Sequence, residues 1–467
     1  MATCEISSTG GRLLVSEDDG LIQARGVRYA TADRFAPPVP FTASPAASPD
    51  LVDATARGPA CPQLPSRLGF LTGPLVDELD TSEQCQVLSV TAPADATDLP
   101  VMVWLHGGAY VSGSGEAAKY DADALVREGR VVVVRVSYRL GILGFLNLAD
   151  AGCDNLGLQD QIAALRWVQD NIAAFGGDPR RVTVFGQSAG GYSALALMMC
   201  PETQTLFSRA ILQSAPLGVH GVDRTAMVAA MRASALARLS GVAPGTADIG
   251  LLMEAQVAAL NAAAPFGMIG KMPFAPTVEQ APMGAAMTSA ASRVEILVGY
   301  TRDDALPFVM LDQRGARLRR LGAVGAAASS AAGRLITRQM FGAPRAGAGR
   351  FLARGRRAGS HLPRRLDPRP IRCMPLHRGS AAAGFTRNMV GRTDVGCRRG
   401  RRRVGGACSR AVERFRTRLL IERKHPRPNR TGGVSSLASG GDDRDHGCGH
   451  DRRPPAQPAC RQRRSRC

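Results

Sequence analysis

Five short runs of mainly aliphatic residues constrain the fold of this chain more than any other feature. Continuous apolar runs of this length are typical of strands that are buried on both faces of a sheet. A helix is predicted over Leu156–Phe175, and "GGDP" (Gly176–Pro179) ends it before the next strand. Strands that alternate with helices predict an α/β fold with a mostly parallel central sheet and helices on both faces. The five runs are Val101–Leu105, Val131–Tyr138, Arg181–Phe185, Ala210–Ser214 and Glu295–Tyr300.

The charge of the chain divides it into unlike parts. The 467 residues carry a net charge of +20. Met1–Asp312 contains 21 basic and 31 acidic residues, whereas the rest contains 38 basic and 8 acidic residues with Lys424 as its only lysine. Few segments in that last part could bury an apolar face. We therefore predict a folded domain over residues 1–312, a degraded continuation over 313–344 and an arginine-rich tail of low order over 345–467.

Composition also sets expectations about cofactors and location. The 11 cysteines include no CxxC pair and no regular metal-ligand spacing, so no metal or cofactor is predicted. "HGCGHD" (His446–Asp451) contains metal-binding residue types, but no supporting fold surrounds it. The N-terminus lacks the apolar core of a secretory signal, and no stretch has transmembrane length. These features predict a cytoplasmic protein without a membrane partner, and they leave the oligomeric state open.

The segment "VTVFGQSAGGYSAL" (Val182–Leu195) has the pattern of a strand, a tight turn and a helix. Gly186, Ala189 and Gly190 are small enough for such a turn and would leave the Ser188 hydroxyl exposed above the sheet. The N-terminus of the following helix would direct its dipole at that hydroxyl. A nucleophilic serine is the functional interpretation, and a plain turn of small residues is the structural alternative.

A second glycine-rich turn follows the strand Val101–Leu105 in "WLHGGAYVSGSG" (Trp104–Gly115). Consecutive glycines allow main-chain N–H groups to line an anion-binding concavity. Acyl transfer needs such donors for its tetrahedral oxyanion, and we predict an oxyanion hole from Gly107, Gly108 and the N–H of Ala189. His106 in this turn is interpreted as structural rather than as the general base, because it precedes the serine.

At this point the sequence resembles the type-B carboxylesterases, which include para-nitrobenzyl-esterase-like enzymes and the cholinesterases. The resemblance runs from about Gly10 to Asp312 and implies an α/β-hydrolase fold whose C-terminal part is incomplete or disordered in this chain. It rests on "SYRLGILGFL", "NLGLQDQIAALRWVQDNIAAFGGDP" and "VTVFGQSAGG". Gln187 departs from the family, where glutamate is usual.

The resemblance also implies the roles of three further residues. In "LVGYTRDDALPFVML" (Leu297–Leu311), Asp304 matches the triad acid, with aspartate in place of the commoner glutamate. An N-capping aspartate is the structural alternative for Asp304. Cys61 and Cys85 match the pair that forms an N-terminal loop disulfide in many members of the family.

The histidine of the triad should follow Asp304, because the order in this fold is serine, acid, histidine. None of the histidines after Asp304 has the sequence context of the family. The candidates are His361, His377, His425, His446 and His450. The catalytic histidine is therefore left unassigned.

A shift of reading frame is our hypothesis for this missing histidine. Read one nucleotide later, Ile371–Gly384 can encode F-G-A-C-H-C-I-E-V-P-L-L-L-G, which is similar to the histidine segment of the family. Met374 followed by a codon that starts with C forces the first cysteine of that segment. We place the shift after about Pro344, with a second disturbance between Gln313 and Arg334. The alternative is a basic tail that evolved in this frame.

The sequence thus predicts a carboxylic ester hydrolase that forms a serine acyl-enzyme with a small-molecule ester and is impaired without its histidine. The alternative is a non-catalytic, hydrolase-like protein whose basic tail binds nucleic acid or another polyanion.

Overall fold

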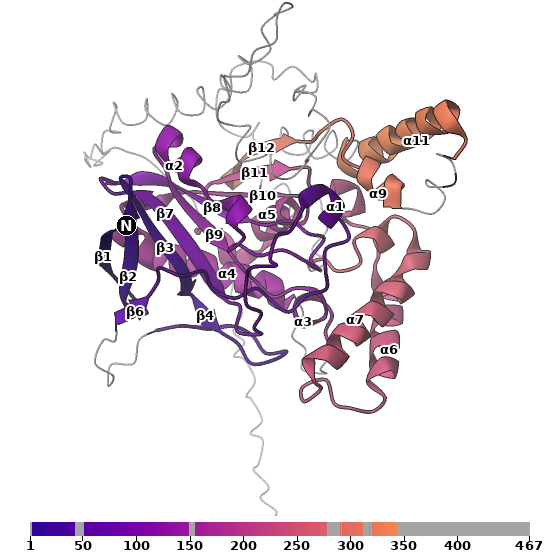
Figure 1. Cartoon of the computed structure of the whole chain (residues 1–467), viewed down its shortest axis with the longest axis horizontal. Coiled ribbons are helices and arrows are strands. Elements are labelled where there is room, and N and C mark those ends of the chain that lie inside the picture. Colours follow the sequence, from indigo (N-terminus) through magenta and orange to yellow (C-terminus); the bar gives the residue numbers. More distant parts are fainter. Residues whose placement is uncertain are drawn as a thin grey trace, which may run out of the picture. The chain divides into compact units, whose positions relative to one another are not determined.

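A computed structural model places a large sheet with helices on both faces at the centre of the chain (Figure 1). Ten strands form this sheet in the order β1-β2-β3-β7-β9-β8-β10-β11-β12, with β6 paired to β2. The predicted tail, 345–467, lies outside the described part of the chain. The structure describes residues 2–42, 51–148, 155–277, 290, 292–311, 317 and 320–342.

The strands of the large sheet are β1 (Ala2–Ser8), β2 (Gly11–Asp18), β3 (Leu21–Arg28), β6 (Leu51–Asp53), β7 (Val87–Pro93), β8 (Leu99–Leu105), β9 (Val132–Val136), β10 (Gly177–Gln187), β11 (Arg209–Gln213) and β12 (Glu295–Gly299). Strands β4 (Ala30–Thr31) and β5 (Val39–Pro40) form a separate pair. The helices are α1 (Gly69–Thr72), α2 (Asp123–Gly129), α3 (Gly141–Phe145), α4 (Leu156–Asn171), α5 (Ala189–Met199), α6 (Thr225–Leu239), α7 (Ile249–Ala263), α9 (Leu306–Leu311) and α11 (Gly322–Thr337).

The sheet is mixed, and its parallel part is the part that the sequence predicts. All five predicted strands are present as β8 to β12, and they lie side by side as one parallel block. The predicted helix is α4, continued by a 3-10 turn to Phe175. Strands β1, β2, β3 and β7 join this block through four antiparallel pairs, so this part of the sheet differs from the parallel expectation.

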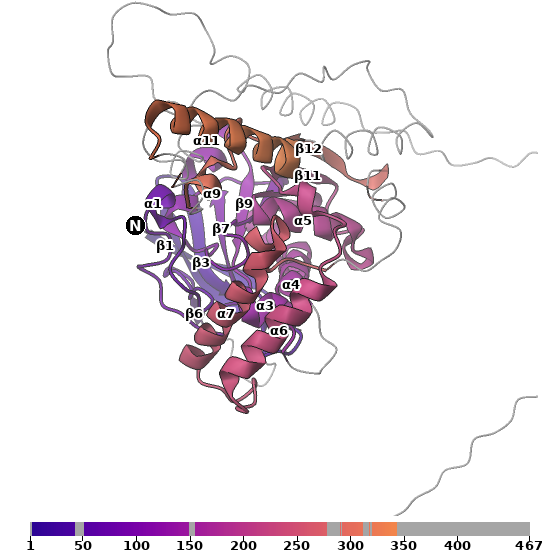
Figure 2. The same cartoon turned by 90° about the vertical axis from the view of Figure 1, so that its right-hand side faces the viewer.

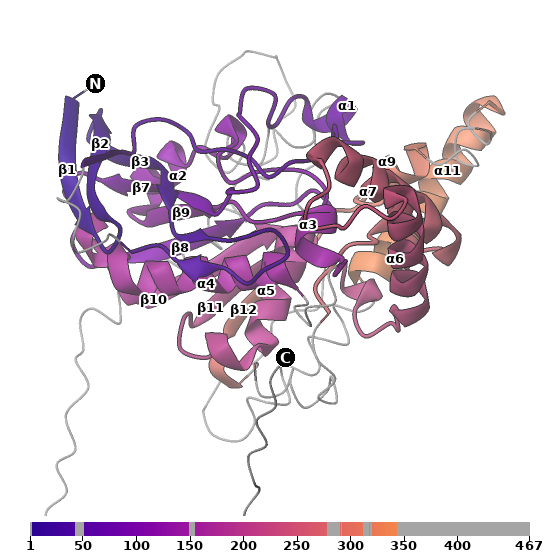
Figure 3. The same cartoon turned by 90° about the horizontal axis from the view of Figure 1, so that it is seen from below.

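Both faces of the sheet are covered, as the continuous apolar runs predict. Alternate residues of a strand point to opposite faces. In β9, Val132, Val134 and Val136 therefore join the core on one side of the sheet. Val133 joins a second cluster on the other side, where α2 contributes Val126. Figure 3 shows α4 and α5 along one side of the strands and α2 along the other.

Helices α6 and α7 form a hairpin beside the sheet (Figures 1 and 2). One stretch in this hairpin, Ile249–Phe266, is long and apolar enough to cross a membrane by length and composition, which differs from the expectation that no stretch has transmembrane length. In the structure α7 packs along α6 and buries Leu252, Ala255 and Ala259. Gln256 accepts a hydrogen bond of 2.8 Å from the Ile142 N–H and so ties α7 to α3.

A buried ion pair joins the loop after β9 to α4. The Arg139 guanidinium donates from Nε and Nη2 to the Asp160 carboxylate, over 2.9 and 2.7 Å. The Arg139 main-chain N–H donates to the same carboxylate over 3.0 Å. The side chains are 3% and 0% exposed, so both charges are removed from water and compensate each other.

Candidate active site

The candidate catalytic residues follow the carboxyl ends of neighbouring parallel strands. The register pairs Leu105 with Gly186, Gln187 with Gln213, and Gln213 with Gly299. The loops that leave β8, β10, β11 and β12 therefore start at the same edge of the sheet. In open α/β sheets this edge is where ligands bind.

Ser188 lies at the junction between β10 and α5. Its main chain has φ 55° and ψ −117°, a conformation that non-glycine residues seldom adopt and that is often found at functional sites. The residue is partly exposed, and its N–H donates to the Gln213 carbonyl over 2.8 Å. Its carbonyl accepts the first hydrogen bond of α5, from the Tyr192 N–H over 3.0 Å. The geometry matches the strand, turn and helix that the sequence predicts.

The glycines around Ser188 allow a close approach of main chains. A methyl group added at Gly190 would lie 2.0 Å from the Leu105 carbonyl oxygen. A methyl group at Gly186 would lie 2.4 Å from the Gly190 carbonyl carbon. Only glycine fits at these two positions, and α5 can therefore pack directly against the end of β8.

The predicted oxyanion-hole residues lie next to this junction. A methyl group added at Gly107 would lie 3.5 Å from the Ser188 Cβ, so the two main chains are adjacent. Gly108, Ala109 and Tyr110 all have positive φ, of 121°, 54° and 60°. Within the described part of the chain, the N–H groups of Gly107, Gly108 and Ala189 donate to no protein acceptor. The N–H of Ala109 likewise donates to no acceptor among the described residues, and it is not one of the three donors that the sequence predicts.

His106 is enclosed beneath this loop. Its ring stacks on Tyr138 with centroids 4.4 Å apart, and its Nδ1 lies 2.9 Å from the Gly107 carbonyl oxygen. The His106 carbonyl accepts a hydrogen bond of 2.7 Å from the Tyr138 hydroxyl. Burial lowers the pKa of His106 to about 4. His106 is therefore neutral at pH 7 and holds the loop in place, which agrees with its structural interpretation.

Asp304 lies on the loop between β12 and α9. Its carboxylate accepts hydrogen bonds from the Thr301 N–H, over 2.7 Å, and from the Thr301 hydroxyl. The Ser214 hydroxyl also donates to this carboxylate. Burial raises the pKa of Asp304, although the hydrogen bonds from Thr301 and Ser214 act in the opposite direction. The bonds come from the preceding loop rather than from the first turn of α9, unlike those of an N-capping aspartate.

Ser214 is a site residue that the sequence analysis missed. It directly follows β11, has φ 48°, and its N–H donates to the Gly299 carbonyl over 2.7 Å. The Gln213 carbonyl accepts a hydrogen bond from the Ser188 N–H. The adjacent residues Gln213 and Ser214 therefore connect Ser188 to the strand that leads into the loop of Asp304. Its position as a polar residue at the end of a predicted parallel strand could have indicated a site residue.

Replacement of Asp304 by asparagine is expected to leave the chain at least as stable at pH 7. The raised pKa means that the folded chain binds a proton more readily than the unfolded chain. The carboxylate therefore costs stability at neutral pH, and the cost disappears as pH falls from the raised pKa towards the ordinary one. Denaturant unfolding of wild type and Asp304→Asn at several pH values measures this. Asp303→Asn is the matched control, and a clear loss of stability in Asp304→Asn at pH 7 would contradict the expectation.

The histidines of the chain divide between the described residues and the tail. The five candidates after Asp304 lie outside the described residues. His220, which the sequence analysis did not consider, follows a 3-10 turn after Ser214, and its Nδ1 lies 3.1 Å from the Tyr192 hydroxyl. Burial lowers the pKa of His220. Tyr192 is one helical turn beyond Ser188, so His220 belongs to the surroundings of the site.

Cys61 and Cys85 are free, buried thiols in the structure. The disulfide that the resemblance implies is therefore not formed. A hydrogen bond with Cys61, together with burial, raises the pKa of Cys85. The Cys61 sulfur also accepts the Leu140 N–H over 3.3 Å. The buried and protonated Cys85 thiol is unreactive.

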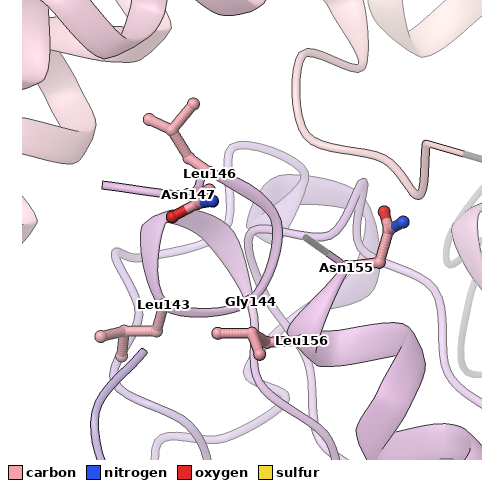
Figure 4. Close-up of a pocket in the computed structure, with 6 residues that line it drawn as sticks. All are labelled: Leu143, Gly144, Leu146, Asn147, Asn155 and Leu156. Carbon is pink, nitrogen blue, oxygen red and sulfur yellow. The ribbon is translucent and has the colours of Figure 1, made fainter. Parts of the chain in front are cut away.

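Metal-binding clusters and cavities add no candidate catalytic residue to this site. No group of three His, Cys, Asp or Glu side chains within the described ranges could hold a metal ion. A cavity of about 10 Å³ between α3 and the start of α4 has room for roughly one water molecule (Figure 4). Leu143, Gly144, Leu146, Asn147, Asn155 and Leu156 line this cavity.

Known proteins resemble this chain over most of the described residues. The family model described as "Carboxylesterase family" matches residues 9–332. A probable N-octanoylanthranilate hydrolase of Rhodococcus erythropolis is 41% identical over 331 residues, which cover 68% of this chain and 71% of that protein. The para-nitrobenzyl esterase of Bacillus subtilis is 38% identical, over 66% of this chain and 64% of that esterase.

Solved structures agree with these relatives. A thermophilic para-nitrobenzyl esterase has a TM-score of 0.57 and 34% identity, with 68% of each chain covered. A Geobacillus stearothermophilus carboxylesterase has a TM-score of 0.62 and 30% identity, and the match covers 75% of this chain and 77% of that one. The α/β-hydrolase fold expected from the resemblance is confirmed. The chain belongs to the carboxylesterase family.

Proposed function

We propose that this chain is the body of a serine carboxylesterase and that Ser188 is its nucleophile. The observation that carries the proposal is the strained Ser188 main chain at a strand–helix junction. Next to it lie main-chain N–H groups that have no hydrogen-bond acceptor among the described residues. Strain of this kind persists where the surrounding fold imposes it and is often part of a mechanism.

The proposed reaction follows from this geometry. The Ser188 Oγ attacks the carbonyl carbon of the ester, and the N–H groups of Gly107, Gly108 and Ala189 bind the oxyanion that forms. Collapse of the tetrahedral intermediate expels the alcohol and leaves an acyl-enzyme. Water then attacks the acyl carbon, releases the acid and restores the serine. Asp304 has the role of orienting the histidine that takes and returns the proton.

We also propose that this step is impaired in the chain as translated. The frame of the tail supplies no histidine in the context of the family, and without a base the serine hydroxyl is a weak nucleophile. Loss of one triad member reduces kcat by about 10⁴–10⁶. The alternative of a non-catalytic, polyanion-binding protein rests only on the charge of the tail, and we do not favour it.

The substrate class extends from simple esters to acylated aromatic acids. One relative is named for hydrolysis of N-octanoylanthranilate, in which a ring carboxylate lies beside the acylated nitrogen. We propose the same class of acyl donor for this chain, together with small carboxylic esters. The hydrolysis products would be a fatty acid and an aromatic amine or alcohol.

Covalent labelling tests the nucleophile without requiring turnover. An organophosphonate with a good leaving group is expected to add one phosphonyl group to the full chain, slowly and on prolonged incubation because the base is missing, and peptide mass spectrometry should place it on Ser188. Ser188→Ala should lose at least about 99% of the adduct, because the substitution removes the proposed nucleophilic hydroxyl. Ser234→Ala, which removes a serine hydroxyl from α6, is the control. An adduct that persists in Ser188→Ala would refute the assignment.

A further inference from the structure

Helix α11 packs on the rest of the fold through its small side chains. The Ala305 N–H donates to the Thr337 hydroxyl oxygen over 3.0 Å, and that hydroxyl donates to the Gly333 carbonyl over 2.8 Å. α11 therefore docks on the loop of Asp304 through a face that has no large apolar side chain. The residues that α11 buries recur every four positions and share that face: Gly325, Ser329, Gly333 and Thr337.

The opposite side of α11 exposes apolar side chains. Leu321, directly before the helix, is 67% exposed, Val324 is 77% exposed and Leu335 is 57% exposed. Ala328 and Ala331 are also exposed and lie between Val324 and Leu335, at helical spacing on one face. We call these five residues the α11 stripe. A helix packed on a globular domain normally turns such a stripe towards the core, whereas α11 turns it outwards, at the edge of the described elements (Figures 1 and 2).

Arginines flank the α11 stripe at both ends. Residues 313–344 contain six arginines and no acidic residue. Arg334 and Arg338 each lie three residues beyond a member of the stripe, so they border it on the helix surface. Arg317 and Arg320 precede the stripe in the sequence, and all four of these side chains are exposed. The surface of α11 is therefore apolar along its middle and positively charged at its ends.

We propose that the α11 stripe binds the surface of a membrane that contains anionic lipids, with α11 lying parallel to that surface. The apolar side chains of such a helix enter the boundary between headgroups and acyl chains, and the arginines beside them attract anionic headgroups. This inference differs from the expectation of no membrane partner, which considered only secretory signals and membrane-spanning stretches. It does not depend on the proposed function, because no candidate catalytic residue takes part in the contact.

A second copy of this chain is less suited to the α11 stripe. The spacing of the stripe would allow two α11 helices to pair. In an antiparallel pair, however, the arginines at one end of each helix would meet those at the other end of its neighbour, and in a parallel pair they would meet their own copies. Both arrangements bring like charges together, and residues 313–344 contain no carboxylate to compensate them. An anionic surface is complementary to the same charges.

Flotation of the full chain with lipid vesicles tests this inference. Vesicles of equal parts phosphatidylglycerol and phosphatidylcholine should bind the wild type at least about tenfold more strongly than vesicles of phosphatidylcholine alone. Combined replacement of Leu321, Val324 and Leu335 by glutamine should lower the partition coefficient at least about tenfold, because three apolar side chains no longer leave water on binding. These side chains are mostly exposed in the fold, so the replacement leaves no cavity in the core.

Two controls on the α6–α7 hairpin locate the contact. Combined replacement of Leu236, Val242 and Val257 by glutamine removes three other exposed apolar side chains and should keep the wild-type partition coefficient. A tryptophan probe, Val324→Trp, should shift its emission to shorter wavelength on anionic vesicles and be quenched by brominated phosphatidylcholine. Val257→Trp, on α7, should show neither change. Quenching at position 257 without quenching at position 324 would overturn the inference.

The basic tail is the rival explanation for binding to anionic lipid. Binding through charge alone would be lost at about 1 M salt and would be equal for the wild type and the triple variant of the α11 stripe. That result would overturn the inference, and so would failure of the wild type to bind anionic vesicles. A dimer in sedimentation velocity that the same triple variant abolishes would also overturn it, because a second copy would then cover the stripe.

Discussion

A gene whose reading frame is shifted back after about Pro344 is expected to encode an enzyme about 10⁴–10⁶ times faster on p-nitrophenyl acetate than the present chain. The described residues already hold the proposed nucleophile, its oxyanion donors and Asp304 at one edge of the sheet. The shifted segment would add the histidine that accepts the Ser188 proton. The gain in kcat/KM is therefore the gain from completing a triad.

Initial rates on both purified chains measure this gain. Ser188→Ala in the restored chain should return the rate to that of the present chain, and replacement of the restored histidine by alanine should do so too. Sequencing of the gene across codons 310–400 is the first check of the hypothesis. An unshifted frame there would refute it, and so would ordinary esterase rates in the present chain that are lost with Ser188→Ala.

Replacement of Asp160 by alanine is expected to reduce the free energy of unfolding by about 3–5 kcal/mol, because it leaves the buried Arg139 charge without its counter-ion. Three hydrogen bonds between these two residues join the loop after β9 to α4. A loss of this size is a large fraction of the stability of a typical domain. Urea unfolding followed by circular dichroism measures it.

The control for Asp160 is an ion pair that stays in water. Arg12 and Glu5 pair on the surface with side chains 47% and 44% exposed, and Glu5→Ala should cost less than about 1 kcal/mol. If Asp160→Ala does not fold, Arg139→Met with Asp160→Leu removes both charges and should be more stable than the single variant. Equal effects of Asp160→Ala and Glu5→Ala would show that the buried pair has no special role.

The parallel half of the sheet could be predicted because its signal is local. Each of β8 to β12 contains a short run of mainly aliphatic residues, and the burial of β8 and β9 within the sheet favours that composition. The antiparallel strands β1, β2 and β3 could not be predicted in the same way. Their buried residues follow no regular alternation, and their partners are set by pairing with distant segments such as β7.

The residues of the candidate site also divide into those with a local sequence signal and those that depend on contacts between distant segments. Ser188, Gly107 and Gly108 were found because each lies in a short motif with a strand before it. Ser214 is recognised only through the pairing of β11 with β12, which brings it to the loop of Asp304. The state of Cys61 and Cys85 depends on burial and redox environment, which a resemblance does not carry over.

The hydrogen bonds from Ser188 to Gln213 and from Ser214 to Gly299 continue the ladder of the sheet into the loops of the site. The proposed catalytic residues are therefore part of the sheet itself and do not belong to a separate segment that could unfold before it. Heat or denaturant would dismantle the reaction centre and the parallel block in one cooperative transition. Substitutions that rigidify surface loops would therefore raise the stability of this site little, whereas substitutions that stabilise the parallel strands would raise it more.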